Sequence, residues 1–134
     1  MIVAQPTNNL ANQMFTYASV KVIALDKKVD FKYFNKYATY AERKYSCIDK
    51  KYGQDFDTIF DIPTEERIYE LPVNINTVSE NPGDKKIYRA YQKELQEIQD
   101  NTLVDGLLVS PYYFLHRLDE GRRWFAFPEG IELR

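Results

Sequence analysis

Hydrophobic and polar positions along the first 33 residues follow two different periods, which predict a strand, a helix and a second strand. Ile2–Ala4 is a short run of β-forming residues that stops before Pro6. From residue 10 to about residue 25, apolar side chains recur near every 3.6 positions on more than one face, which predicts a mostly buried helix. Residues 29–33 alternate like a strand. This order and length are those of one βαβ unit, whose strands are parallel.

The rest of the chain predicts shorter elements joined by polar turns. In chain order they are an irregular helix at 37–52, a strand at 68–71, an exposed loop at 74–84, a strand at 87–91, a short helix at 93–101, a strand at 103–109 with a break at Gly106, and a helix at 111–122. Strands that alternate with helices indicate an α/β fold with a parallel sheet. At 134 residues the chain is one domain of ordinary size or half of a two-domain enzyme.

Composition limits the classes of protein that fit this pattern. A hydrophobic content of 44% and a charged content of 28% are typical of a globular protein. The 18 Lys and Arg residues against 20 Asp and Glu leave no basic surface for nucleic acid and no polybasic membrane patch. No apolar run approaches the roughly 18 residues of a membrane span, and the start lacks the pattern of a signal peptide. Cys47 is the single cysteine, which excludes an internal disulfide. We therefore expect a cytoplasmic protein with no membrane span and no nucleic-acid partner.

The clearest candidate site follows the first strand, where Asn8 and Asn9 precede the predicted helix. In open α/β sheets, the loop between the carboxyl end of a strand and the next helix binds ligands. The N-terminus of a helix favours an anion there, such as a phosphate. Asn12 and Gln13 add uncharged amides that can donate to a phosphate or sugar oxygen. The alternative is that Asn9 caps the helix and Asn12 is an ordinary residue of its first turn.

Two segments resemble bacterial α-1,2-fucosyltransferases of glycosyltransferase family 11. Residues 8–18, NNLANQMFTYA, are similar to the family segment GGLGNQMFQYA, which also follows the first strand. Seven of these eleven positions match, namely Leu10, Asn12, Gln13, Met14, Phe15, Tyr17 and Ala18. Residues 105–114 are similar to the family pattern DGYxQSxKYF, and the matches are Asp105, Gly106, Ser110, Tyr113 and Phe114.

This resemblance implies a Rossmann-like three-layer α/β domain that forms half of a GT-B-like enzyme, with the active site between two halves. It implies transfer of fucose from GDP-fucose to a galactoside acceptor in an α-1,2 linkage, with inversion and without a metal or other cofactor. By resemblance, Asn12, Gln13 and Asn9 contact the donor substrate, and Asp105 is a candidate on the acceptor side. The partners are then a nucleotide-sugar donor and a glycan acceptor, and no residue is assigned as catalytic.

The chain also departs from the family. Asn8, Asn9 and Ala11 replace glycines, and the later H-x-R-R-G-D segment, whose Arg is thought to engage the donor diphosphate, is absent. Residues 121–124 contain two adjacent arginines without the rest of that segment. We therefore expect residues 1–134 to be an N-terminal domain without its C-terminal donor-binding half, and to show no transferase turnover alone.

Two further expectations follow from a missing half. The apolar surface that it would leave exposed can pair with a second copy of the chain, so a homo-oligomer is one expected outcome. The alternative function is a non-enzymatic module that binds carbohydrate or protein through its Tyr-rich surface, since the chain has 11 Tyr residues. His116, the only histidine, is expected to have a surface or packing role because no partner lies near it in sequence.

Overall fold

The computed structural model describes residues 1–6, 10–34, 60, 62–80 and 91–125 of the chain. Within this part, five strands form one sheet in the order β3-β2-β1-β5-β4, and every pair of neighbouring strands is parallel. The strands are β1 (Ile2–Ala4), β2 (Phe31–Phe34), β3 (Arg67–Ile68), β4 (Asn76–Ser79) and β5 (Thr102–Asp105). The protein therefore has an α/β fold, and the predicted parallel pairing of the first two strands is confirmed, with Ile2 opposite Phe31.

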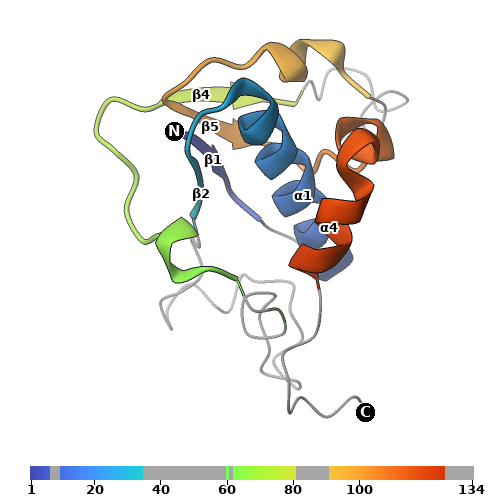
Figure 1. Cartoon of the computed structure of the whole chain (residues 1–134). Helices are drawn as coiled ribbons and strands as arrows, with labels where there is room; N and C mark the ends of the chain where they lie inside the picture. Colours follow the sequence, from blue (N-terminus) through green and yellow to red (C-terminus); the bar gives the residue numbers. More distant parts are fainter. Residues whose placement is uncertain (7–9, 35–59, 61, 81–90, 126–134) are drawn as a thin grey trace.

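Helices cover this sheet on the side shown towards the right in Figure 1. The 18-residue helix α1 (Leu10–Lys27) lies against β1 and β2, and the shorter α4 (Leu118–Trp124) lies beside α1. Short 3₁₀ helices connect the strands and precede α4; these are η1 (Thr64–Glu66), η2 (Lys93–Glu97), η3 (Pro111–Tyr113) and η4 (Leu115–Arg117).

The core lies between α1 and the sheet. Because side chains alternate along a strand, Ile2 and Ala4 of β1 point to the same face, where they join Val20 and Ile23 of α1 in one buried cluster. Tyr17 is at the centre of this cluster, and its ring packs edge-on against Phe31 with 5.2 Å between ring centroids. The predicted helix is thus confirmed together with its buried character, since residues 16–24 of α1 are all buried.

The end of α1 explains why the next strand begins later than predicted. Lys28 has a left-handed backbone with φ of 58°, and its N–H donates to the carbonyl of Leu25 at 3.1 Å. The N–H of Val29 donates back to the carbonyl of Ala24, also at 3.1 Å. These two bonds form a Schellman cap, which satisfies free carbonyls at the helix end. The cap uses Val29, so β2 begins at Phe31 instead of residue 29.

Several shorter elements differ from the prediction. The sequence predicts an exposed loop at 74–84, but Asn76–Ser79 form strand β4, whose four residues are all exposed. The strand predicted at 103–109 stops at Asp105, and the helix predicted at 111–122 is divided into η3, η4 and α4. The predicted helix at 93–101 is one stretch of 3₁₀ helix, and the strand predicted at 68–71 is only Arg67–Ile68. The elements predicted at 37–52 and 87–91 lie outside the described residues, apart from residue 91.

Candidate functional site

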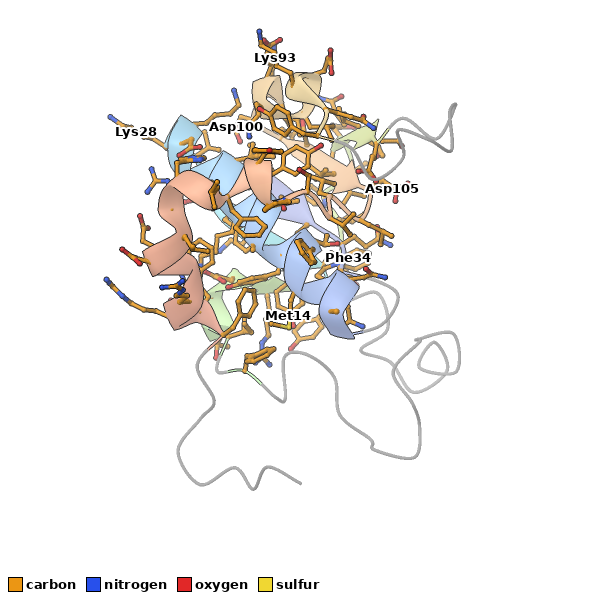
Figure 2. All side chains as sticks on the ribbon, turned by 90° about the vertical axis from the view of Figure 1, so that its right-hand side faces the viewer. Met14, Lys28, Phe34, Lys93, Asp100 and Asp105 are labelled. Atoms are coloured by element: carbon orange, nitrogen blue, oxygen red, sulfur yellow. The ribbon has the colours of Figure 1, made fainter. Side chains whose placement is uncertain are left out.

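The carboxyl ends of the parallel strands mark the edge of the sheet where a ligand site is expected. β1 lies between β2 and β5, so the chain leaves β1 towards one side of the sheet and later returns to its other side. Such a reversal of strand order places a crevice beside the carboxyl end of β1. Figure 2 shows Phe34 and Asp105, the last residues of β2 and β5, on the opposite side of the molecule from Lys28 and Asp100.

The predicted donor contacts lie at the start of α1, next to this edge. Asn12 is partly exposed in the first turn of the helix, and its carbonyl accepts a hydrogen bond from the Thr16 hydroxyl at 3.0 Å. Gln13 is only 5% exposed, which favours a role in bracing the helix start over direct contact with a ligand. Asn9 lies outside the described residues.

The loop after β5 is fastened to α1 by hydroxyl groups. Thr16 Oγ1 donates to the carbonyl of Leu107 at 3.0 Å, and Ser19 Oγ donates to the carbonyl of Leu108 at 2.9 Å. Both hydroxyl-bearing residues are buried on the face of α1 that meets this loop. The first turns of α1 and the residues after Asp105 are therefore held at the same edge, although they lie some 90 residues apart in sequence.

Asp105, the candidate on the acceptor side, is the last residue of β5 and its side chain is exposed. It lies opposite Ser79 of β4 in the strand pairing. Val104 pairs with Ala4 and lies with it in the core under α1, so by the alternation of side chains Asp105 points to the opposite face of the sheet. Asp105 and Asn12 are thus at the same edge but on different faces of the sheet.

Glu80 is a residue of this edge that the sequence pattern does not reveal. It follows β4 directly, its side chain is 4% exposed, and its Oε1 accepts a hydrogen bond from the Leu107 N–H at 3.3 Å. Burial raises the pKa of the Glu80 carboxyl, and hydrogen bonds from the N–H groups of Leu107 and Leu108 oppose that shift. A buried carboxylate at the carboxyl edge of a parallel sheet is a stronger candidate site residue than exposed Asp105.

Gly106 lets Glu80 approach this loop. A Cβ atom added at Gly106 would lie 2.6 Å from Cβ of Glu80 and 3.0 Å from Cδ1 of Leu108. Leu108 itself has a left-handed backbone with φ of 49°, which is uncommon for a residue other than glycine, asparagine or aspartate. The absence of a side chain at Gly106 and the left-handed backbone at Leu108 therefore both shape the loop that contacts the Glu80 carboxylate.

A second buried polar cluster lies at the other side of α1, away from this loop. Lys21 forms an ion pair with Glu66, with 2.8 Å between Nζ and Oε2, and donates to the Tyr17 hydroxyl at 3.0 Å. The Tyr17 hydroxyl in turn donates to Glu66, and burial together with this bond raises the pKa of Tyr17. The Lys21 ammonium also lies over the ring of Trp124, 4.5 Å from its centroid. The cluster is fully paired, which indicates a structural role.

His116 is at the surface, as expected from its sequence context. Its Nε2 lies 2.7 Å from Oδ2 of Asp26, and the Arg117 Nε donates to the other oxygen of the same carboxylate at 2.7 Å. These contacts join η4 to the last turns of α1 and involve no other candidate site residue. Cys47 lies outside the described residues.

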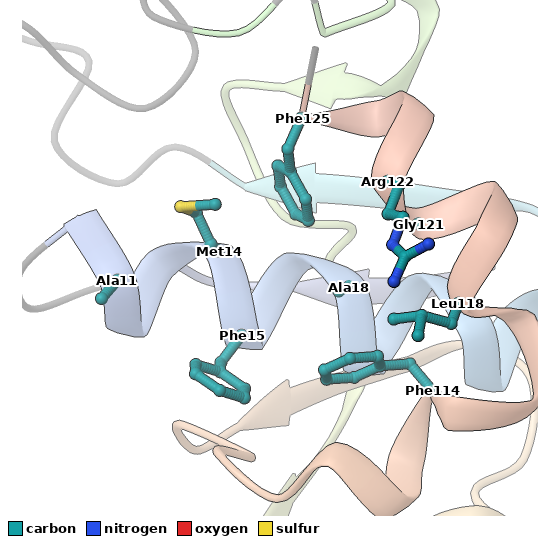
Figure 3. Close-up of a pocket in the computed structure, with 9 residues that line it drawn as sticks. All are labelled: Ala11, Met14, Phe15, Ala18, Phe114, Leu118, Gly121, Arg122 and Phe125. Atoms are coloured by element: carbon teal, nitrogen blue, oxygen red, sulfur yellow. The ribbon is translucent and has the colours of Figure 1, made fainter.

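An apolar pocket opens between α1 and α4, as Figure 3 shows, with a volume of about 260 Å³. Its lining atoms are apolar, and the residues around it are Ala11, Met14, Phe15, Ala18, Phe114, Leu118, Gly121, Arg122 and Phe125. The pocket lies on the outer face of α1 and does not include Asn12, Glu80 or Asp105.

The comparisons with known proteins add no relative: no protein-family model, curated protein or solved structure matches this chain. No helix within the described residues is both long and apolar enough to cross a membrane. In the same part of the chain, His, Cys, Asp and Glu side chains do not gather in threes as a metal site.

Proposed function

We propose that this chain is the N-terminal part of a glycosyltransferase that transfers fucose from GDP-fucose to a galactoside acceptor. The reaction would form an α-1,2 linkage with inversion, without a metal, in a GT-B-like enzyme with two Rossmann-like halves. Asn12 and Asn9 are the donor contacts of this proposal, Gln13 braces the donor site or contacts the donor, and Asp105 lies on the acceptor side.

One observation supports this proposal best. The two segments that resemble the fucosyltransferases, residues 8–18 and 105–114, lie far apart in sequence. The parallel sheet brings the first turns of α1 and the loop after β5 together through the bonds of Thr16 to the carbonyls of Gly106 and Leu107. This edge is where an open α/β sheet binds its ligand. Two resembling segments on one expected binding edge favour the shared function over a chance likeness.

The proposal also predicts that the isolated chain is inactive. Departure of GDP places negative charge on the diphosphate, and without a metal that charge has to be met by Arg side chains, amides and helix ends. Asn12 and the N-terminus of α1 supply only part of such a site, because the arginine motif of the resembled family is absent from the sequence. We expect no fucosyl transfer by residues 1–134 alone, and detection of transfer would contradict this part.

Calorimetric titration of GDP-fucose tests the donor site. We expect the wild-type chain to bind, and Asn12→Ala to weaken binding about tenfold or more, because a hydrogen bond to a charged group is worth about 1.5–3 kcal/mol. Asn76→Ala is the matched control, since Asn76 is an exposed residue of β4. Equal affinities of wild type and Asn12→Ala would remove Asn12 from the site.

The alternative, a non-enzymatic binding module, is favoured by a different observation. The pocket between α1 and α4 has apolar walls, and Tyr112 and Leu115, in the segment that precedes α4, are 67% and 52% exposed. Apolar surface of this kind suits a protein partner better than a nucleotide. A chain that fails to bind GDP-fucose but retains this surface would fit the alternative.

A further inference from the structure

Glu80 is buried in a way that protein carboxylates normally avoid. One carboxylate oxygen accepts the N–H of Leu107, while the other, Oε2, is buried and has no hydrogen-bond partner among the described residues. No Lys, Arg or His of the described chain forms an ion pair with it. Burying a carboxylate with an unpaired oxygen costs free energy of folding. A residue kept at such a cost is a candidate for a function such as ligand binding.

The loop that faces Glu80 is shaped around it. The N–H groups of two successive residues, Leu107 and Leu108, both act on the carboxylate, and the second of these residues is left-handed. Successive N–H groups in such a turn form a concavity that binds anions. On its other side the loop is held by Thr16 and Ser19 through the carbonyls of the same two residues. The loop therefore fixes the carboxylate in place and leaves Oε2 without a hydrogen bond from any described residue.

We propose that Oε2 of Glu80 accepts a hydrogen bond from a hydroxyl group of a sugar bound at the carboxyl edge of the sheet. A phosphate would be repelled by a carboxylate, whereas a sugar hydroxyl is a neutral donor and suits a lone acceptor. The inference rests on the proposed function, in which the hydroxyl comes from the galactoside, the fucose or the ribose. Because the Glu80 side chain is 4% exposed, the atoms that cover Oε2 have to move before a sugar hydroxyl can reach it.

A purely structural role for Glu80 predicts a different effect of substitution. If the carboxylate only braces the loop, removing its charge weakens two hydrogen bonds and lowers stability. If it is kept for a ligand, the uncharged isostere Glu80→Gln retains an acceptor for Leu107 and removes the cost of burying the charge. Burial raises the pKa of Glu80 above its ordinary value of 4.5, so the folded protein favours the protonated carboxyl. The stabilisation from the protonated form is therefore complete below pH 4.5 and is lost as the pH rises through the folded-state pKa.

Thermal unfolding of wild type and Glu80→Gln over a range of pH tests this difference without any ligand. Among the described residues, the N–H groups of Leu107 and Leu108 bind the carboxyl, and the Tyr113 phenol is close enough to interact with its charge. Burial raises the pKa of Tyr113 to about 12, so none of these groups titrates between pH 4 and 8. We expect equal melting temperatures at the acid end and a higher melting temperature for Glu80→Gln towards neutral pH. Glu80→Ala leaves both N–H groups without their acceptor and should melt lower than wild type throughout.

Titration with three probes then tests the ligand. Methyl β-galactoside, GDP-fucose and GDP are titrated into wild type and Glu80→Gln, and we expect a loss of affinity of about tenfold or more for at least one. A loss with the galactoside assigns the hydroxyl to the acceptor, a loss with GDP-fucose alone to fucose, and a loss with GDP to ribose.

Three results separate the two proposals. Equal affinities of wild type and Glu80→Gln for every probe, or a lower melting temperature of Glu80→Gln at neutral pH, would overturn the role of Glu80. Wild-type binding of the galactoside but not of GDP-fucose would contradict the proposed function and leave Glu80 as a sugar contact. A wild-type chain that binds none of the probes would contradict both.

Discussion

Gly106, which follows β5, lies against Glu80, which follows β4, and the missing side chain of Gly106 permits this contact. A Cβ at this position would lie 2.6 Å from Cβ of Glu80, much closer than carbon atoms pack. We expect Gly106→Ala to lower the free energy of unfolding by about 1–3 kcal/mol, because the backbone or Glu80 has to move. Urea unfolding measures this change.

Gly121 provides the control for Gly106. Gly121 is buried, but a Cβ added there would meet only Trp124, at 3.9 Å, which is ordinary van der Waals contact. Because Gly121 lies inside helix α4, Gly121→Ala should leave stability unchanged or raise it by up to about 1 kcal/mol. If both alanine variants behaved alike, steric contact with Glu80 would not be the reason for glycine at position 106.

Single residues differ greatly in how far their roles could be predicted. The place of Asn12 follows from local pattern, because a strand, a turn and an apolar helical period put it in the first turn of α1. Glu80 could not be found in this way, since its partner Leu107 lies 27 residues further along the chain. Its surroundings in sequence are polar and typical of a loop, so no local signal marks the residue as buried.

Helix α1 is joined to η1 by the ion pair between Lys21 and Glu66, whose side chains are 11% and 14% exposed. Removing one partner of a buried ion pair leaves the other charge uncompensated. We therefore expect Lys21→Met to lower the free energy of unfolding by about 3–5 kcal/mol. The double variant Lys21→Met/Glu66→Leu should recover most of that loss, because neither charge remains. Denaturant unfolding of both variants checks this.

Lys27→Met is the matched control for this ion pair, because Lys27 is an exposed residue in the last turn of α1. It should change stability by less than about 0.5 kcal/mol. A cost of similar size for Lys21→Met would mean that the ion pair contributes no more than a surface residue does.

Elements were predictable where hydrophobic period and length agreed. α1 satisfies both conditions: it begins at Leu10 as predicted and ends at Lys27, two residues later than predicted, where the Schellman cap closes it. β4 satisfies neither, because Asn76–Ser79 are all exposed and lack alternation. That strand exists through its pairing with β5, from Asn76 opposite Thr102 to Ser79 opposite Asp105, and such long-range pairing leaves no local pattern.

At the scale of the whole molecule, the order of the strands was the least predictable feature. The opening βαβ unit predicts that β1 and β2 are neighbours, and this is confirmed. The insertion of β5 between β1 and β4 depends on contacts between segments about 100 residues apart, such as Ile2 with Thr102. The same insertion creates the reversal of strand order beside β1, so the location of the candidate site depends on topology more than on any single motif.

The pocket between α1 and α4 lies where elements from the two ends of the described chain pack together, and filling it tests that packing. Ala18 of α1 is 3% exposed and lines this pocket, so a larger side chain has about 260 Å³ of space to enter. We expect Ala18→Leu to raise the free energy of unfolding by about 1–2 kcal/mol, at about 0.8 kcal/mol per buried CH₂ less side-chain entropy.

Ala24→Leu is the control, because Ala24 is a 0% exposed residue of the same helix in the core. It should lower the free energy of unfolding by about 1–3 kcal/mol through overpacking. Thermal unfolding of both variants separates these effects: equal destabilisation would show that the pocket is closed, whereas a stabilised Ala18→Leu variant would show that the apolar space between α1 and α4 is open.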